Sequence, residues 1–571
     1  MIVNKCNKIN PVLYIILGIN FLLSILLGIY SGGGHSDASN YITLAIQIVN
    51  QNDWGQLLLT NDGREIFSIW LCFLCIFMTV FGASNMSAIL LTSIFGTSGI
   101  YAFYRLVRLF WDRKSSYFLT TILAITPVYL VISHNALYDA LFIFIFFTAL
   151  FYYFRFFENY KRKEIIISGF LMSLLAFVHA AGYPYIFFLW VVFIAFDKST
   201  DRWKNWIIFS FFAGVLPVVQ MLIWKFVIYD SFYPYQTLAY DWSTSNDLFE
   251  AVVLLKHKLR FVLTLILGYT PVLFLTLFIY LFDIPWKSKK MIVLGCGIFL
   301  LTIIGLLLYG IHIDSLYPLI IVFILIYTIT LKRELIEQNG LVFFFGLMSV
   351  FTFSIYVRFF PKPYFHQKHF IYPVIFLIPI YWYYAKKFIR NDFKIFLILI
   401  IAMGLQSMVS LYFQLPQNID KRPSGFNVKY SSTFKFSLPY TNEGIQKDIA
   451  KWYKNKGIQV NAYIITNRHE RYVNAQLNMA QNHYIKIIDS YSIINGFEKP
   501  SLTKTINVIN KYQPAFIHWD KDKNNSLYQK IDINGKRKFL FSYEELLNSL
   551  PDNYTLADSI DNKIIFFQNI R

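Results

Sequence analysis

An acidic residue, Asp37, follows the first long apolar run of the chain, residues 11–30. That run carries no charged side chain and is long enough to cross about 30 Å of hydrocarbon. Asp37 is therefore expected beside a membrane surface, where a carboxylate can act as a base toward a lipid-linked substrate. Asp37 also begins a pattern with Tyr41 and Ala45 at four-residue spacing, which puts the three positions on one face of a helix.

Two further titratable residues are expected on the same side of the membrane. Asp139 lies where the apolar segment 117–133 gives way to the segment 138–157, and an acid at the edge of hydrocarbon is costly unless it is paired or hydrated. It is either a functional residue or a helix N-terminal acid stabilised by the helix dipole. His179 ends the apolar segment 164–179 and is either a phosphate contact or an interface histidine.

A basic segment, residues 362–373, carries His366, Lys368, His369 and Tyr372 between two later apolar segments. Its charges lie on the side of the membrane that the other basic clusters avoid. Cations kept there suit an anion at the bilayer surface, and lipid phosphate is the anion found at that depth. The alternative is a loop whose basic side chains snorkel to the headgroups.

Composition identifies a polytopic α-helical membrane protein. Of the 571 residues, 56% are hydrophobic and 19% aromatic, which is more apolar surface than a soluble core buries. The apolar residues fall into blocks of about 17–25, the length of a membrane-crossing helix. The net charge of +19 would suggest nucleic acid in a soluble protein. Here most cations lie between apolar blocks, so no nucleic-acid partner is expected.

The four cysteines predict neither a disulfide framework nor a metal site. Cys72 and Cys75 form a CxxC pair, but no second Cys or His pair with metal-ligand spacing lies nearby. Packing in an apolar segment is therefore the preferred interpretation, and no cofactor is predicted.

The apolar blocks predict about thirteen membrane spans. Besides 11–30, spans are expected at 86–106, 117–133, 138–157, 164–179, 183–197, 205–227, 261–283, 291–310, 315–331, 340–358, 370–386 and 393–414. Every second junction is basic, at Arg105–Lys114, Lys161–Lys163, Lys198–Lys204, Lys287–Lys290, Lys332–Arg333 and Lys386–Arg390. The positive-inside rule places these junctions and the N-terminus in the cytoplasm of a plasma (inner) membrane protein. Asp37 and the C-terminal region are then outside.

The apolar segment 66–82 is nearly long enough to cross the membrane. A crossing there would move the later basic loops to the outer side, or move the N-terminus and Asp37. The segment is therefore predicted to lie on the outer surface as an interfacial helix, with a full span as the alternative.

After residue 414 the composition becomes that of a soluble protein. Short β-rich runs alternate with segments of helical character; the runs are Val460–Thr466, Ile485–Asp489, Ala515–Trp519 and Ile564–Gln568, and the helical segments are 443–454, 469–481 and 502–511. This alternation predicts an extracytoplasmic α/β domain over 415–571, behind a transmembrane catalytic region over 1–414 whose first outer loop is 31–85. The domain lacks a Gly-rich phosphate loop and a nucleophile elbow, so it is expected to handle an acceptor or stabilise the protein.

The order of these features resembles the GT-C superfamily of integral-membrane glycosyltransferases, especially the branch with protein O-mannosyltransferases and the lipid A aminoarabinose transferase. The resemblance covers about residues 1–390. The shared features, in chain order, are Asp37, Tyr41 and Ala45, then Trp70 in a juxtamembrane helix that ends at Phe81–Ser84, then an Arg-rich inner loop, Pro127 and Asp139, and finally the basic segment with Phe370, Pro373 and Pro379.

Three features depart from the pattern of that superfamily. Ala38 replaces the usual acid after the first loop Asp, residues 64–66 replace Lys-Pro-Pro, and His179 replaces the usual Lys or Arg. These departures leave the donor sugar and a divalent-metal requirement open. The Trp-Trp-Asp motif of the oligosaccharyltransferase branch is absent from the sequence, which argues against glycan transfer to asparagine.

The resemblance implies an enzyme that moves a sugar from a polyprenyl-phosphate donor to a hydroxyl on a lipid, glycan or protein acceptor at the outer membrane face. A phosphate leaving group needs little protonation, whereas the acceptor hydroxyl needs a base, the role expected of Asp37. Asp139 is expected as a second catalytic carboxylate. The expected substrate contacts are Tyr41, His179, His366, Lys368, His369 and Tyr372, with the basic ones on the departing phosphate. A single displacement inverts the anomeric centre.

Two other classes share the membrane design. A polysaccharide polymerase or ligase usually has its important residues in large outer loops between late spans, whereas the segment 228–260 is modest. A transporter or flippase of lipid-linked sugars predicts charged or broken helices near the membrane centre and an internal repeat. No clear repeat is present in the sequence.

Overall fold

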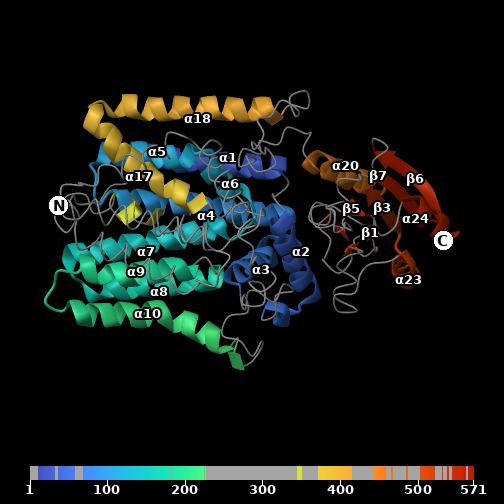
Figure 1. Ribbon diagram of the computed structural model, residues 1–571, viewed down its shortest axis with the longest axis horizontal. Coiled ribbons are helices and arrows are strands. Elements are labelled where there is room, and N and C mark those ends of the chain that lie inside the picture. Colours follow the sequence, from blue (N-terminus) through green and yellow to red (C-terminus); the bar gives the residue numbers. More distant parts are fainter. Residues whose placement is uncertain are drawn as a thin grey trace.

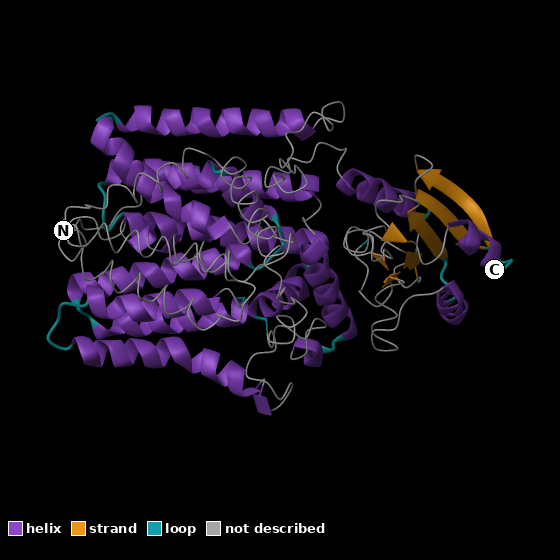
Figure 2. Cartoon of the chain, viewed as in Figure 1, coloured by secondary structure: helices purple, strands orange, loops and turns teal. Residues whose placement is uncertain are grey.

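The chain forms a helical bundle and a smaller region built around a β-sheet (Figure 1). The computed structural model describes residues 11–31, 36–57, 68–179, 182–223, 225–226, 371–414, 442–457, 502–520, 543–560 and 564–570, together with short pieces within 342–349 and at 464–466, 477, 484–486, 530–531 and 537–538. Figure 2 shows that helices dominate the first part and that the strands gather near the C-terminus.

The bundle consists of helices that run roughly side by side (Figure 1). They are α1 (Pro11–Ser31), α4 (Asn85–Val107), α5 (Arg113–Ile125), α6 (Pro127–His134), α7 (Asp139–Asn159), α8 (Arg162–Val178), α9 (Gly182–Phe196), α10 (Arg202–Ile223), α17 (Ile371–Phe388) and α18 (Asp392–Gln414). Among the described residues, α1, α4, α7 and α10 are long and apolar enough to cross a membrane. The chain is therefore a membrane protein with several apolar helices.

The number of spans stays a prediction. The segments expected to cross at 261–283, 291–310 and 315–331 lie outside the described residues, and 340–358 is described only in short pieces.

The segment predicted as one span, 117–133, forms two helices that meet at Thr126. The break follows from Pro127, which has no N–H to donate and holds the preceding residue out of the helical conformation. Thr126 accordingly has an extended ψ of 122°. The carbonyl of Ala124 accepts a hydrogen bond from Asn20 Nδ2 of α1 at 2.9 Å. A side chain of another helix thus satisfies a carbonyl beside the break, as the bilayer interior requires.

Aromatic side chains fill the centre of the bundle, which accounts for the aromatic content of the chain. Tyr153 of α7 is fully buried and contacts the rings of Phe193 and Phe209 at centroid distances of 5.8 and 5.7 Å. Close backbone approach also contributes, because a Cβ added at Gly96 of α4 would lie 2.6 Å from the Ser133 side chain. Such packing drives helix association where lipid removes the hydrophobic effect.

Two further helices close one end of the bundle. α2 (Ser36–Gln51) runs across the ends of the longer helices, and α3 (Ile69–Phe81) packs against it (Figure 1). α3 has 13 residues and is about 20 Å long at 1.5 Å per residue, less than the roughly 30 Å of hydrocarbon. This length favours the predicted surface helix over a full span for residues 66–82.

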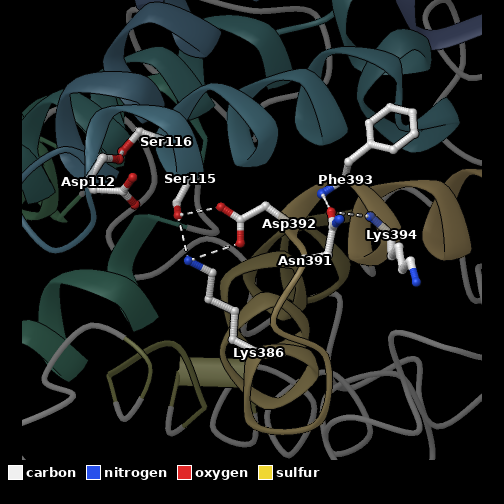
Figure 3. Close-up of polar contacts among 8 residues, drawn as sticks. All are labelled: Asp112, Ser115, Ser116, Lys386, Asn391, Asp392, Phe393 and Lys394. Carbon is white, nitrogen blue, oxygen red and sulfur yellow. Dashed lines mark hydrogen bonds and ion pairs between the residues drawn. The ribbon is translucent and has the colours of Figure 1, made fainter.

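The described basic junctions gather at the opposite end of the bundle (Figure 1). Arg162 Nη2, at the start of α8, lies 3.3 Å from Asp201 Oδ2, just before α10. Figure 3 shows a second contact there: Lys386 Nζ of α17 lies 3.2 Å from Asp392 Oδ1 of α18 and donates to Ser115 Oγ of α5 at 2.7 Å. Each contact links segments between helices that the predicted topology assigns to the same side of the membrane. Such contacts are possible only if those segments share one end of the bundle.

The sheet region lies beyond the end of the bundle that carries α2 (Figure 1). Its sheet has five strands in the order β2-β1-β3-β7-β6. The strands are β1 (Ile464–Thr466), β2 (Tyr484–Lys486), β3 (Phe516–Asp520), β6 (Tyr554–Ile560) and β7 (Ile564–Asn569). β1 pairs with β2 and β3 in parallel, and β7 pairs with β3 and β6 in antiparallel fashion. A separate two-stranded sheet joins β4 (Lys530–Ile531) to β5 (Arg537–Lys538).

Helices cover both faces of the five-stranded sheet. Alternate strand residues point to opposite faces, so Phe516 and Phe566 pack with α20 (Asn442–Asn455) in one apolar cluster. Ile517 and Phe567 pack with α23 (Leu502–Tyr512) and α24 (Tyr543–Ser549) in another. The result is a layered α/β arrangement.

The sequence placed most of these elements. β1, β2, β3 and β7 overlap the four predicted β-rich runs, and α20 and α23 coincide with two predicted helical segments. β6 was missed because most of its side chains are exposed, which removes the alternation that marks a strand. The helical segment predicted at 469–481 lies almost wholly outside the described residues. The extracytoplasmic location of this region stays a prediction.

Candidate functional site

The helix α2 supplies the first part of the site, at the end of the bundle away from the basic junctions. Asp37 lies in its first turn and Tyr41 one turn later, on the same face. The Tyr41 ring meets the Tyr138 ring edge-on, with centroids 6.1 Å apart and an interplanar angle of 87°. This contact joins α2 to the connection between α6 and α7.

That connection brings an acid into the site. Asp139 is the first residue of α7 and is buried, with 5% of its surface exposed. A carboxylate in the first turn of a helix is stabilised by the backbone N–H groups and the helix dipole, which offsets part of the cost of burial. The preceding Tyr138 is also buried, and its carbonyl accepts the Phe142 N–H at 2.8 Å. The acid is thus fixed by its helix.

His179 approaches from the end of α8. It caps that helix in an extended conformation, and its N–H donates to the Leu175 carbonyl at 3.0 Å. Its own carbonyl accepts the Gly182 N–H at 2.8 Å, so the backbone is held on both sides. The imidazole lies against the Tyr138 ring with centroids 4.3 Å apart and planes inclined by 13°. Tyr138 therefore contacts both Tyr41 and His179.

The helix α3 packs against both α2 and α4. It begins after Ser68, whose hydroxyl accepts the Leu71 N–H at 3.4 Å. Trp70, which the sequence pattern singled out, is fully buried. Its indole contacts Phe95 of α4 at a centroid distance of 6.4 Å, while its Nε1 finds no hydrogen-bond partner within the part of the chain that the structure describes. Trp70 is thus a packing residue between α3 and α4.

The structure brings together several predicted site residues. Tyr41, Asp139 and His179 come from three separate segments and meet at Tyr138 or beside it, and the turn that carries Asp37 belongs to the same helix as Tyr41. The side chains of Asp37 and Tyr372, and the whole of His366, Lys368 and His369, lie outside the described residues. The donor-phosphate role of the basic segment stays a prediction.

Tyr138 is the member of this cluster that sequence analysis missed. The only signal was its place directly before Asp139, where many residue types are equally acceptable. Tyr138 contacts Tyr41, which lies 97 positions earlier in the chain, and His179, which lies 41 positions later. Sequence spacing does not indicate contacts over such separations.

Across the described segments, no three His, Cys, Asp or Glu side chains lie close enough together to hold a metal ion. The arrangement offers a carboxylate, an imidazole and phenol rings at the end of apolar helices. Such groups can move a proton, bind an anion and pack against a sugar ring.

Comparison with known proteins gives one sequence-family match. Residues 69–224 match the family model described as dolichyl-phosphate-mannose-protein mannosyltransferase. No curated protein matches the chain.

Two solved structures are similar along most of the chain. The crystal structure of ArnT from Cupriavidus metallidurans in the apo state is 12% identical, covers 97% of this chain and 97% of its own, and has a TM-score of 0.43. The Archaeoglobus fulgidus oligosaccharyltransferase, tethered by a disulfide bond to an acceptor peptide with the NVT sequon, is 13% identical, covers 95% of this chain and 75% of its own, and has a TM-score of 0.39. The matched residues 69–224 contain Asp139 and His179, and over this segment the predicted resemblance to GT-C membrane glycosyltransferases is confirmed.

Proposed function

We propose that this protein is a membrane glycosyltransferase that moves a sugar from a polyprenyl-phosphate donor to an acceptor hydroxyl. The observation that carries the proposal is the meeting of Tyr41, Tyr138 and His179 beside Asp139 at one end of a bundle of apolar helices. The family-model match over residues 69–224 supports glycosyl transfer. A polyprenyl chain stays in the bilayer, so its reacting group is presented where helix ends meet the surface.

The reaction is a single displacement at the anomeric carbon. The acceptor oxygen forms a bond to that carbon while the bond from the carbon to the donor phosphate oxygen breaks. The electron pair leaves with the phosphate, and the hydroxyl proton passes to a base, the role we assign to Asp37. The configuration at the anomeric carbon inverts, because the enzyme forms no covalent bond to the sugar.

Positive groups are needed where the phosphate departs. We assign this role to His179 together with His366, Lys368 and His369, because charge-assisted hydrogen bonds stabilise charge that develops on the leaving phosphate. Asp139 is the second carboxylate, placed at the start of α7 on the same side of the bundle as α2. Tyr41 and Tyr372 complete the proposed substrate contacts.

Orientation follows from the two ends of the bundle. The basic junctions gathered around Lys386 and Arg162 favour the cytoplasmic side. The cluster around Tyr138 then lies on the outer side, in the plasma (inner) membrane. The sheet region lies beyond the end of the bundle that carries α2 (Figure 1), and we assign to it the handling of a lipid, glycan or protein acceptor.

The test uses Asp37→Asn in purified protein reconstituted into vesicles. The amide keeps the shape of the side chain but takes no proton, and positioned general bases contribute about 10²- to 10⁴-fold to rate. We expect a loss of that size in the release of polyprenyl phosphate from a panel of polyprenyl-phosphate hexoses and pentoses, with a membrane glycolipid extract as acceptor.

Asp53→Asn is the matched control. Asp53 is an exposed carboxylate two residues past the other end of α2, so its neutralisation changes the charge of the same region and should leave turnover unchanged. Full turnover in Asp37→Asn would remove that residue from the chemistry. Absence of turnover in the unsubstituted protein with every donor of the panel would contradict the transferase.

A further inference from the structure

Tyr138 is held more firmly than the two residues it touches. It has 5% of its surface exposed, whereas Tyr41 and His179 are half-buried. It also lies at the turn into α7, where its carbonyl accepts the first hydrogen bond of that helix, from Phe142. A buried ring in this position is a poor substrate contact but a firm support for its neighbours.

The geometry of its contact with His179 is specific. The two rings are nearly parallel, 13° apart, with centroids at 4.3 Å, so the imidazole lies over the face of the phenol. Parallel stacking of this kind restricts rotation of both rings. The contact therefore fixes the plane of the imidazole.

The backbone of His179 is fixed as well. Its N–H and its carbonyl both make hydrogen bonds, to Leu175 and from Gly182. With the backbone and the ring plane both set, the imidazole has little rotational freedom left to lose when it binds. Binding groups whose rotamers are locked beforehand contribute more affinity, because less entropy is lost on binding.

Tyr41 holds the opposite side of this arrangement. Its ring meets Tyr138 edge-on at 6.1 Å, a favoured aromatic geometry, and it belongs to the helix that begins with the Asp37 turn. Tyr138 thus connects the segment assigned to the acceptor base with the residue assigned to the donor phosphate.

We propose that Tyr138 is a positioning residue that holds the His179 imidazole flat against its ring, in the orientation in which it binds the phosphate of the lipid-linked donor. This inference rests on the proposed function. Tyr138 acts through His179 and needs no contact of its own with the sugar.

The test compares donor kinetics in reconstituted protein with a polyprenyl-phosphate sugar as the probe. Tyr138→Leu removes the ring and should raise the donor KM about three- to tenfold, the loss expected for one aromatic contact, with kcat changed less than about twofold. Tyr138→Phe keeps the ring face and should restore the original KM. Tyr138→Met fills the volume without a ring and should behave as Tyr138→Leu does if the leucine variant folds poorly.

Tyr117→Leu is the matched control. Tyr117 stacks on Tyr104 at the basic end of the bundle, with centroids 5.5 Å apart and planes inclined by 7°. Its loss removes a comparable pair of stacked rings and should leave the donor KM unchanged, which separates positioning from general stability.

A double substitution decides whether the effect passes through His179. His179→Ala should raise the donor KM about 10- to 150-fold, as expected when a charge-assisted contact to phosphate is lost, and adding Tyr138→Leu should raise it no further. Multiplying effects would show that Tyr138 acts by another route and would overturn the proposal. So would an unchanged KM in His179→Ala with transfer intact, an outcome that leaves the proposed function standing. Loss of transfer with every donor, even in the unsubstituted chain, would instead count against the function.

Discussion

At one end of the bundle Lys386 and Asp392 form an ion pair with Ser115 between them, whereas at the other end Tyr41, Tyr138 and His179 meet through their rings. In the ion pair each charge is matched by its partner, so the contact holds α5, α17 and α18 together (Figure 3). At the other end the Tyr138 ring stacks on the His179 imidazole and meets the Tyr41 ring edge-on. The first arrangement joins helices through charge, and the second joins α2, the start of α7 and the end of α8 through aromatic rings.

The acids at the two ends share one feature, because each is the first residue of a helix, Asp139 of α7 and Asp392 of α18, where the helix dipole stabilises a carboxylate. They differ in their surroundings. Asp392 lies 3.2 Å from the ammonium of Lys386, whereas Asp139 is buried, with 5% of its surface exposed, directly after Tyr138.

The experiment with the largest expected effect asks on which side of the membrane each end lies. In a background with all four cysteines replaced by serine, Gln51→Cys places a thiol at the exposed end of α2, and Thr200→Cys places one in the exposed junction before α10. An impermeant maleimide added to intact cells should label Gln51→Cys and spare Thr200→Cys until the cells are opened. The reverse pattern would put the aromatic cluster in the cytoplasm and contradict the proposed orientation.

The next test compares the two acids by activity. Asp139→Asn should lower turnover by about tenfold or more, because it neutralises the carboxylate next to Tyr138 that we assign to the site. General acid–base or electrostatic groups contribute at least that much to the rate. Asp392→Asn should leave turnover within about twofold, since that acid only joins helices at the other end. Steady-state rates in reconstituted protein measure both. Equal losses in the two variants would mean that Asp139 is no more than a helix-terminal acid.

Sequence analysis could predict what depends on local pattern. Apolar length gave α1, α4, α7 and α10 nearly to their ends, and β-rich runs gave four strands of the C-terminal sheet. The acid Asp139 and the histidine His179 could also be chosen, because a titratable group at the edge of hydrocarbon is costly.

Contacts between distant segments could not be predicted in this way. Tyr138 meets His179 because α8 returns beside α7, a fact of packing that no spacing in the sequence contains. The break at Thr126 had a local cause in Pro127, yet membrane helices tolerate proline when a neighbour satisfies the backbone. The neighbour, Asn20, lies more than a hundred positions away.

The smallest expected effect concerns the ion pair that joins α17 and α18. Lys386 and Asp392 are 34% and 12% exposed, whereas Arg162 and Asp201 at the same end are 50% and 59% exposed.

Water and ions screen an exposed pair more strongly, so a double-mutant cycle with Lys386→Met and Asp392→Asn should give a coupling of about 0.5–1 kcal/mol in the free energy of unfolding. The cycle with Arg162→Met and Asp201→Asn should give about half of that or less. Unfolding titrations with sodium dodecyl sulfate in mixed micelles measure both. A coupling for Lys386 and Asp392 no larger than that of the exposed pair would mean that packing of α5 against α17 and α18, rather than charge, holds this end together. The statement that charge joins one end of the bundle, in contrast to the aromatic rings at the other end, would then be wrong for the end with Lys386 and Asp392.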